Sequence, residues 1–93
     1  MDKVTDWWHD YKVRPLVSAV MSKADKIRLS HLERTIKKMP SLSEEDKYHL
    51  EKMTKVIVAK ILINPINVIK ANRYNDSHYI KIVEELFRLK EDN

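Results

Sequence analysis

The fold of this chain is decided by residues 37–46, which read KKMPSLSEED. Lys37 and Lys38 place positive charge where the negative end of a helix dipole would lie, and Pro40 cannot continue a helix. Ser43 can then cap a second helix, whose first turn carries three acids at the positive end of its dipole. The stretch therefore predicts the end of one long helix and the start of another.

The residues before this stretch predict the first long helix. From Pro15 to Met39, apolar side chains recur at intervals of three and four, with lysines and arginines between them. A shorter helix is expected from Asp2 to Lys12, because Pro15 breaks or kinks the backbone hydrogen-bond ladder. The first half of the chain is thus expected to be helical throughout.

The residues after it predict a second long helix that is apolar on almost every side. Residues 56–63 read VIVAKILI and leave hardly any polar face, so several sides of this segment must be covered. A β-strand is the alternative, but the preceding caps and the continuing helical period favour a buried helix. Asn64 and Pro65 predict a kink or a restart of the helix.

The end of the chain predicts a shorter helix. Residues 72–76 read as a loop, and Asp76 or Ser77 can cap a helix whose apolar stripe includes Tyr79, Val83 and Phe87. We therefore expect an all-α protein, an antiparallel helical bundle with long first and second core helices and a shorter terminal helix. The apolar surplus on so short a chain is typical of half of an obligate dimer interface, so we expect a two-fold partner to complete the bundle.

The composition argues against chemistry within this chain. It has no cysteine and no glycine, so thiolate nucleophiles, disulfides and glycine-rich phosphate loops are all excluded. The histidines at positions 9, 31, 49 and 78 lack the spacing of three or four that would present two imidazoles to one metal. We expect no catalytic, cofactor-binding or metal-binding residue. No segment is long and apolar enough for a membrane span, and a cytoplasmic location is expected.

Positive charge leaves a second function open. The net charge is +4, and a stand-alone basic helical module that binds RNA would need little more than clustered cations along one helix. Asp25 and Glu33 interrupt the cluster, which makes a solvated helix face the simpler interpretation. The cations concerned are Lys23, Lys26, Arg28, Arg34, Lys37 and Lys38.

Several short segments occur in an order and spacing typical of one enzyme family. They are Trp8, Arg14-Pro15-Leu16, His31-Leu32-Glu33-Arg34, Lys37-Lys38-Met39-Pro40, Leu42-Ser43-Glu44-Glu45-Asp46, Met53-Thr54-Lys55, Lys60-Ile61-Leu62 with Pro65, and Glu84-Glu85-Leu86-Phe87-Arg88-Leu89. Through them the chain resembles the C-terminal dimerisation domain of glutamyl-tRNA reductases over nearly its whole length.

The resemblance implies that the chain is a scaffold within a homodimeric oxidoreductase. Such an enzyme uses NADPH to convert glutamyl-tRNA to glutamate-1-semialdehyde, at the start of tetrapyrrole (porphyrin and heme) biosynthesis. The resemblance places its catalytic cysteine and its NADPH site in other domains, with tRNA a candidate partner of the full-length enzyme. It implies one helical dimerisation domain over residues 1–93, with the end of a connecting helix at 1–14, the bundle at 15–89 and a frayed tail at 90–93.

The resemblance also implies which residues face the second copy. The two core helices would pack against their two-fold copies through an isologous interface. The expected interface residues are Val17, Val20, Met21, Ala24, Ile27, Leu50, Met53, Ile57, Ile61 and Leu62.

A third class, a small helical dimeric enzyme resembling chorismate mutase, would need arginines that converge inside the bundle. Burying cations without partners is costly, so this class is disfavoured. The arginines concerned are Arg14, Arg28, Arg34, Arg73 and Arg88.

Overall fold

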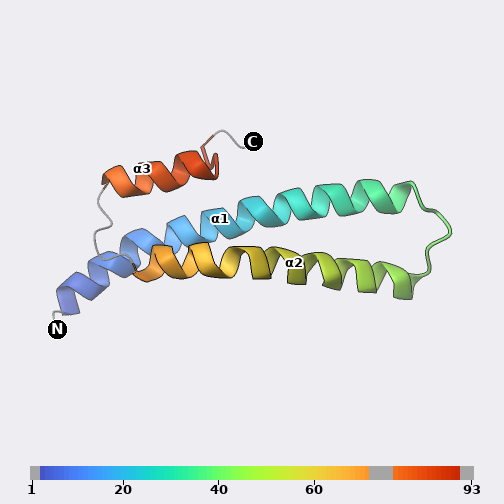
Figure 1. Cartoon of the computed structure of the whole chain (residues 1–93), viewed down its shortest axis with the longest axis horizontal. Helices are drawn as coiled ribbons and strands as arrows, with labels where there is room; N and C mark the ends of the chain where they lie inside the picture. The colour runs from blue at the N-terminus through green and yellow to red at the C-terminus, as the bar shows by residue number, and fades with distance from the viewer. Residues whose placement is uncertain (1–2, 72–76, 91–93) are drawn as a thin grey trace.

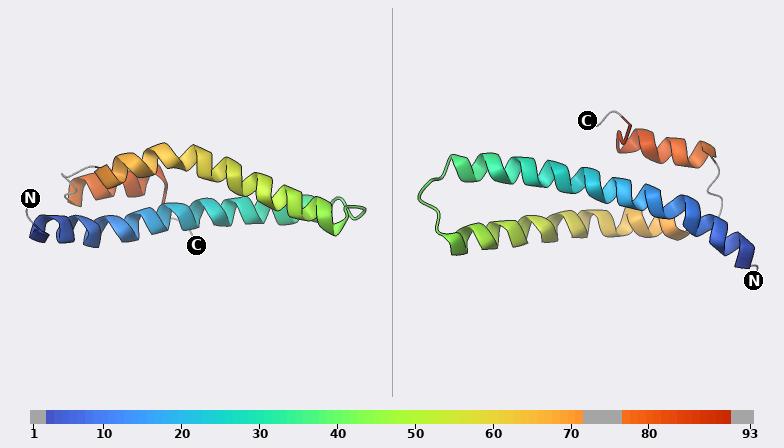
Figure 2. Two further views of the ribbon diagram at one scale, coloured as in Figure 1. Left: turned by 90° about the horizontal axis from the view of Figure 1, so that it is seen from below. Right: turned by 180° about the vertical axis from the view of Figure 1, so that it is seen from behind.

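The computed structural model describes the backbone of residues 3–71 and 77–90, and the side chains of residues 13–71 and 78–90. Its helices are α1 (Lys3–Lys37), α2 (Glu44–Ala71) and α3 (Ser77–Leu86). Helices α1 and α2 form a long antiparallel hairpin, and α3 lies beside the end of the hairpin that is remote from the turn (Figures 1 and 2). The described residues form no strand, and the expected all-α fold is confirmed.

The turn between α1 and α2 forms where residues 37–46 predict it. The amides of Lys38 and Met39 donate to the carbonyls of Thr35 and Ile36 at 3.1 and 3.0 Å, which tightens the end of α1. At the start of α2, the Asp46 amide donates to Ser43 Oγ at 3.0 Å and the Ser43 amide donates to Asp46 Oδ2 at 3.4 Å. These reciprocal bonds form a capping box with aspartate in place of glutamate.

Both long helices continue through an internal proline. α1 includes Pro15 and α2 includes Pro65. The expected separate helix from Asp2 to Lys12, the break at Pro15 and the restart at Pro65 are therefore wrong, and the kink is the alternative that remains for Pro65. An internal proline removes one backbone hydrogen bond but leaves helical dihedral angles accessible on both sides. Packing of the neighbouring residues, including Val17 and Ile69, holds the helices together across these positions. α2 does bend, where its colour passes from yellow to orange in the left view of Figure 2.

The end of α3 shows what a chain without glycine does at a helix C-terminus. The Leu89 amide donates to the Glu84 carbonyl at 2.9 Å and the Arg88 amide to the Glu85 carbonyl at 3.2 Å, the bond pattern of a Schellman motif. This motif needs a left-handed residue, and Arg88 takes that conformation with a φ of 51°. Leu89 then packs against the core.

The core lies at one end of the hairpin. It contains residues from all three helices, and the partly buried Tyr79, Ile80 and Phe87 of the α3 segment pack against it. Between α3 and the turn, the hairpin consists of α1 and α2 alone among the described residues. Few residues are buried in this part, among them Leu32 and Arg28. The buried core residues are Val13, Leu16, Val17, Val20, Leu62, Ile69 and Val83.

The shape of the chain is that of an incomplete bundle. It measures 57 × 27 × 16 Å and its radius of gyration is 16.9 Å, whereas a compact domain of this length has a radius of about 12 Å. Its accessible surface is 7603 Å², about one third more than the roughly 5,700 Å² typical of a compact monomer of this mass. No described helix is long and apolar enough to cross a lipid bilayer.

Candidate dimer interface

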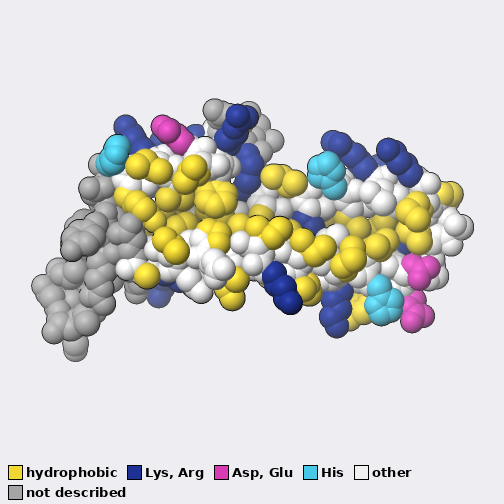
Figure 3. Space-filling view, in the orientation of Figure 1, with side chains coloured by type: hydrophobic (Ala, Val, Ile, Leu, Met, Phe, Trp, Pro, Cys, Tyr) yellow, Lys and Arg dark blue, Asp and Glu magenta, His cyan; other side chains and the backbone are white. Residues whose placement is uncertain are grey.

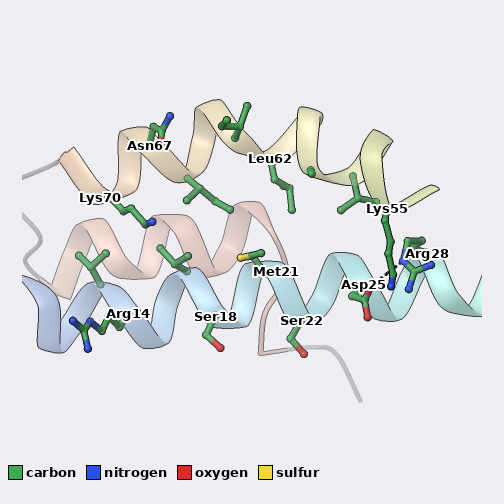
Figure 4. Close-up of a pocket in the computed structure, with 16 residues that line it drawn as sticks. Arg14, Ser18, Met21, Ser22, Asp25, Arg28, Lys55, Leu62, Asn67 and Lys70 are labelled. Atoms are coloured by element: carbon green, nitrogen blue, oxygen red, sulfur yellow. Dashed lines mark hydrogen bonds and ion pairs between the residues drawn. The ribbon is translucent and has the colours of Figure 1, made fainter. Parts of the chain in front are cut away.

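Two grooves run between α1 and α2 on opposite faces of the hairpin. The rear groove, of about 1150 Å³, is lined by residues such as Arg14, Met21 and Ile63. Figure 4 looks into it with α3 behind the two long helices, so it opens away from α3. The distal groove, of about 550 Å³, has a lining that includes Ile27 and Ile57. It lies on the other face, towards the turn, where Figure 3 shows a yellow stripe between the helices.

The lining of the distal groove is almost wholly apolar. From α1 it receives Ala24 and Ile27, and from α2 it receives Met53, Ile57 and Ile61. These side chains lie there because both helices carry apolar residues at intervals of three and four. At the three-helix end α3 packs on the core residues of α1 and α2, whereas no residue that the structure describes covers this part of the hairpin. The groove is therefore an unpartnered continuation of the core.

A stripe of apolar residues extends this surface along α2. We define the α2 stripe as Leu50, Ile57, Ile61 and Val68, which are separated by seven, four and seven residues. Such spacing keeps the four side chains on one face of a helix and is typical of helices that pair with another helix. Ile57, Ile61 and Val68 are 48, 66 and 63 % exposed. At 1.5 Å per residue, the stripe is about 27 Å long.

The ten expected interface residues divide into three groups by burial. Val17, Val20 and Leu62 are buried in the core of the single chain, so they support the surface from beneath. Ala24 and Leu50 are half-buried. The remaining five, Met21, Ile27, Met53, Ile57 and Ile61, are exposed large apolar residues.

The grooves bring most of these residues together. Seven of the ten line the distal groove: Ala24, Ile27, Leu50, Met53, Ile57, Ile61 and Leu62. Val17 and Met21 face the rear groove instead. Val68 was not among the residues expected from the sequence, although its place seven residues after Ile61 could have indicated it.

A buried cation lies between the two grooves. Arg28 is 8 % exposed; its Nε donates to Asp25 Oδ1 at 2.8 Å and its Nη1 to Thr54 Oγ1 at 3.3 Å. Thr54 in turn donates to the Glu51 carbonyl at 2.9 Å. The Asp25 carboxylate is largely exposed, so Arg28 exchanges part of its hydration for one charge-assisted bond. Figure 4 shows Arg28 beside Asp25, with Lys55 reaching towards them from α2.

The arginines do not gather into a substrate site in the described part of the chain. Arg28 alone is buried, while Arg14, Arg34 and Arg88 are exposed. Arg14 and Arg28 both line the rear groove but lie about 21 Å apart along α1, and neither Arg34 nor Arg88 lines it. Arg73 lies outside the described residues, as do the side chains of Trp7 and Trp8. The convergent arrangement that a chorismate mutase-like enzyme would need is therefore absent among Arg14, Arg28, Arg34 and Arg88.

Comparison with known proteins decides the family. Residues 1–89 match the family described as the glutamyl-tRNAGlu reductase dimerisation domain. The chain belongs to this family. It is 36 % identical to a glutamyl-tRNA reductase of Syntrophobacter fumaroxidans over 94 % of the chain and 19 % of the relative. It is 32 % identical to one of a Sulfurihydrogenibium species over 99 % of the chain and 21 % of the relative.

The dimerisation domain thus spans about a fifth of the curated relatives it matches. A third glutamyl-tRNA reductase, of Natranaerobius thermophilus, is 35 % identical over 92 % of the chain and 19 % of its own length. No solved structure matches the chain. Among the residues described for this dimerisation domain, no three histidine, aspartate or glutamate side chains gather into a group that could hold a metal ion. Its notable surface is the apolar one between α1 and α2.

Proposed function

We propose that this dimerisation domain joins two subunits of a cytoplasmic, NADPH-dependent glutamyl-tRNA reductase through the distal groove and the α2 stripe. The whole enzyme would convert glutamyl-tRNA to glutamate-1-semialdehyde, the first step of tetrapyrrole synthesis. The names of the relatives and the resemblance of the chain support this activity. NADPH does not fit this domain, because its phosphates call for glycine-rich turns and the chain has no glycine. The domain would act only as a scaffold.

The exposed apolar surface carries the proposal. A compact monomer of this mass would expose about 1,900 Å² less than the 7603 Å² found here. A stable protein interface buries on the order of 800 Å² from each partner, so the excess is large enough to form one. Large apolar residues at half or greater exposure, such as Met53 and Ile61, are what a partner would cover.

The spacing of the α2 stripe suggests how two copies meet. Intervals of seven, four and seven read the same from either end, so an antiparallel pair of α2 helices would match its apolar residues across a two-fold axis near Ala59. Ile57 would lie opposite the partner's Ile61, and Leu50 would lie opposite the partner's Val68. Parallel pairing would place each residue beside its own copy and would make no use of the symmetric spacing. We therefore propose an antiparallel seam.

The first experiment measures molar mass by light scattering across a concentration series. We expect twice the 11.1 kDa of one chain. Ile57→Lys should shift the chain to monomer, because it places a charge in the middle of the seam, and we expect at least a tenfold loss of dimer affinity. Val56→Lys is the matched control, since Val56 is the neighbouring residue, is 45 % exposed and lines neither groove. A monomeric wild type, or equal losses in the two variants, would contradict the proposed interface.

A second experiment tests the antiparallel arrangement. The chain has no native cysteine, so Ile57→Cys and Ile61→Cys each introduce a single thiol. In the proposed dimer, positions 57 and 61 of opposite chains are level, whereas two copies of position 57 are offset by about 6 Å along the helices. A disulfide needs Cα atoms within about 7 Å, so the mixture of variants should cross-link faster than either variant alone. Faster cross-linking within each single variant would indicate parallel pairing instead.

A further inference from the structure

The net charge of the chain is concentrated in one segment. Residues 26–43 hold five lysines and arginines against the single acid Glu33, a net +4 that equals the net charge of the whole chain. The structure separates these cations by position. Arg28 is buried between α1 and α2 and engages Asp25, whereas Lys26, Arg34, Lys37 and Lys38 are exposed. We define these four exposed residues as the basic stripe.

The helical period places the basic stripe on one edge of α1. Lys26, Arg34 and Lys37 lie eight and three residues apart, which brings them to the same side of the helix, and Lys38 follows its last residue. Lys23 adds a further cation one turn earlier on this side, where its Nζ donates to the Arg88 carbonyl at 3.1 Å. From Lys23 to Lys37 the edge is about 21 Å long. Figure 3 shows dark blue side chains along this upper edge.

The basic stripe has few counter-charges and is not used elsewhere. Its four cations form no ion pair with any residue that the structure describes; Glu33 is the one acid on α1 between Lys26 and Lys37. None of the four lines the distal groove or the rear groove. Pairing of two subunits through the α2 stripe would therefore leave both copies of the basic stripe accessible. Unpaired, extended positive charge of this kind favours a polyanion over a compact acidic ligand.

From these observations we infer that the basic stripe binds the phosphate backbone of the tRNA substrate. The inference rests on the proposed function for its choice of polyanion. Lysine and arginine contacts to phosphates do not read base sequence, so the stripe would position the tRNA body and leave recognition of its identity to other parts of the enzyme. In a two-fold dimer the two stripes would offer one such surface for each subunit. The dimerisation domain would then contribute to substrate binding as well as to assembly.

The test measures binding of a fluorescently labelled tRNA transcript to the 93-residue chain between 50 and 200 mM salt. Four phosphate contacts predict an affinity that falls about 100-fold over this range. Changing Lys26, Arg34, Lys37 and Lys38 to Gln should lower the affinity at 50 mM at least tenfold and remove most of the salt dependence. The control changes Lys47, Lys52, Lys55 and Lys60 of α2 to Gln, which removes the same charge from another helix. It should retain most of the affinity.

Two results would overturn the inference. One is a wild-type chain that does not bind tRNA at 50 mM salt, and the other is an equal loss of affinity in the stripe variant and the α2 variant. Circular dichroism and light scattering of the same samples show whether each variant is still folded and dimeric. A chain that forms dimers but does not bind tRNA would overturn this inference and leave the proposed dimer intact. A monomeric chain that binds tRNA through the stripe would overturn the proposed dimer and support this inference.

Discussion

The two ends of the hairpin are built from the same two helices but differ in what covers them. At the end where α3 packs, Val20 and Ile69 are 1 and 3 % exposed. Towards the turn, residues of the same type on the same helices are exposed, including Ile27 and Ile57. The apolar pattern shows little change where α3 ends. A helical pattern therefore defines which face must be covered, while the covering element can come from the chain itself or from a second copy.

Substitution of a core residue at the three-helix end should cause the greatest loss of stability. Ile69→Ala removes a buried side chain from the three-helix core and should lower the free energy of unfolding by about 2 to 5 kcal/mol at every protein concentration. Ile61→Ala is the matched control, because Ile61 is 66 % exposed in the single chain. Its loss of stability should appear only at concentrations where the dimer forms. Thermal unfolding at two widely separated concentrations distinguishes the two behaviours, and a concentration-independent loss in Ile61→Ala would remove the distinction between the two ends.

A smaller effect is expected from the buried cation between the grooves. Arg28→Ala removes both the packing of the long side chain and its bonds to Asp25 and Thr54, and should cost about 1 to 3 kcal/mol. Arg28→Met keeps most of the packing, and Asp25 remains solvated, so its cost should be about half as large. Urea denaturation measures both. If the two variants lose the same stability, the hydrogen bonds outweigh the packing.

The turn offers a test at the end that lacks a core. Ser43→Ala removes the side-chain oxygen that accepts the Asp46 amide, and should cost about 1 kcal/mol. Ser41→Ala is the control, because Ser41 lies in the same turn and is exposed outside the helices. Amide hydrogen exchange in the first turn of α2 should rise in the Ser43 variant and stay unchanged in the Ser41 variant. Equal exchange in both would show that the cap contributes little to this end.

The smallest effect is a gain of stability at the opposite end. Arg88 adopts a φ of 51°, which is strained for any residue with a Cβ atom. Arg88→Gly should relieve this strain and raise the free energy of unfolding by about 0.5 to 1 kcal/mol. Calorimetry would register a melting temperature higher by a few degrees. A lower melting temperature would mean that contacts of the arginine side chain contribute more than its backbone strain costs.

The sequence predicts the helices better than their environment. The ends of α1 and α2 follow from Lys37, Pro40 and Ser43, because caps and breakers act within one turn. Continuity through Pro15 and Pro65 could not be predicted, since it depends on contacts with other helices that outweigh one lost backbone bond.

The periodicity of the sequence does not determine which apolar residues of a helix are buried. Val20 and Met21 are neighbours with the same apolar character, yet Val20 is buried and Met21 is exposed. The reason is that the period of α1 does not specify which of its sides faces α2 and α3. Arg28 is buried for the same reason, although its charge predicts exposure. The set of ten interface residues therefore mixed core residues with surface residues. Val17, Val20 and Leu62 belong to the core that includes Val83 of α3, and the exposed residues of the set do not.

The capping box at the turn has a consequence for the order in which the chain folds. Only residues 38–43 separate α1 from α2, and closing a loop this short takes on the order of tens of nanoseconds. The three-helix core instead joins residues as distant as Val13 and Val83, which requires a far larger loop and a larger loss of chain entropy. The two helices are thus expected to zip together from the turn. Folding would begin at the end with the least core and finish where the native state is most stable.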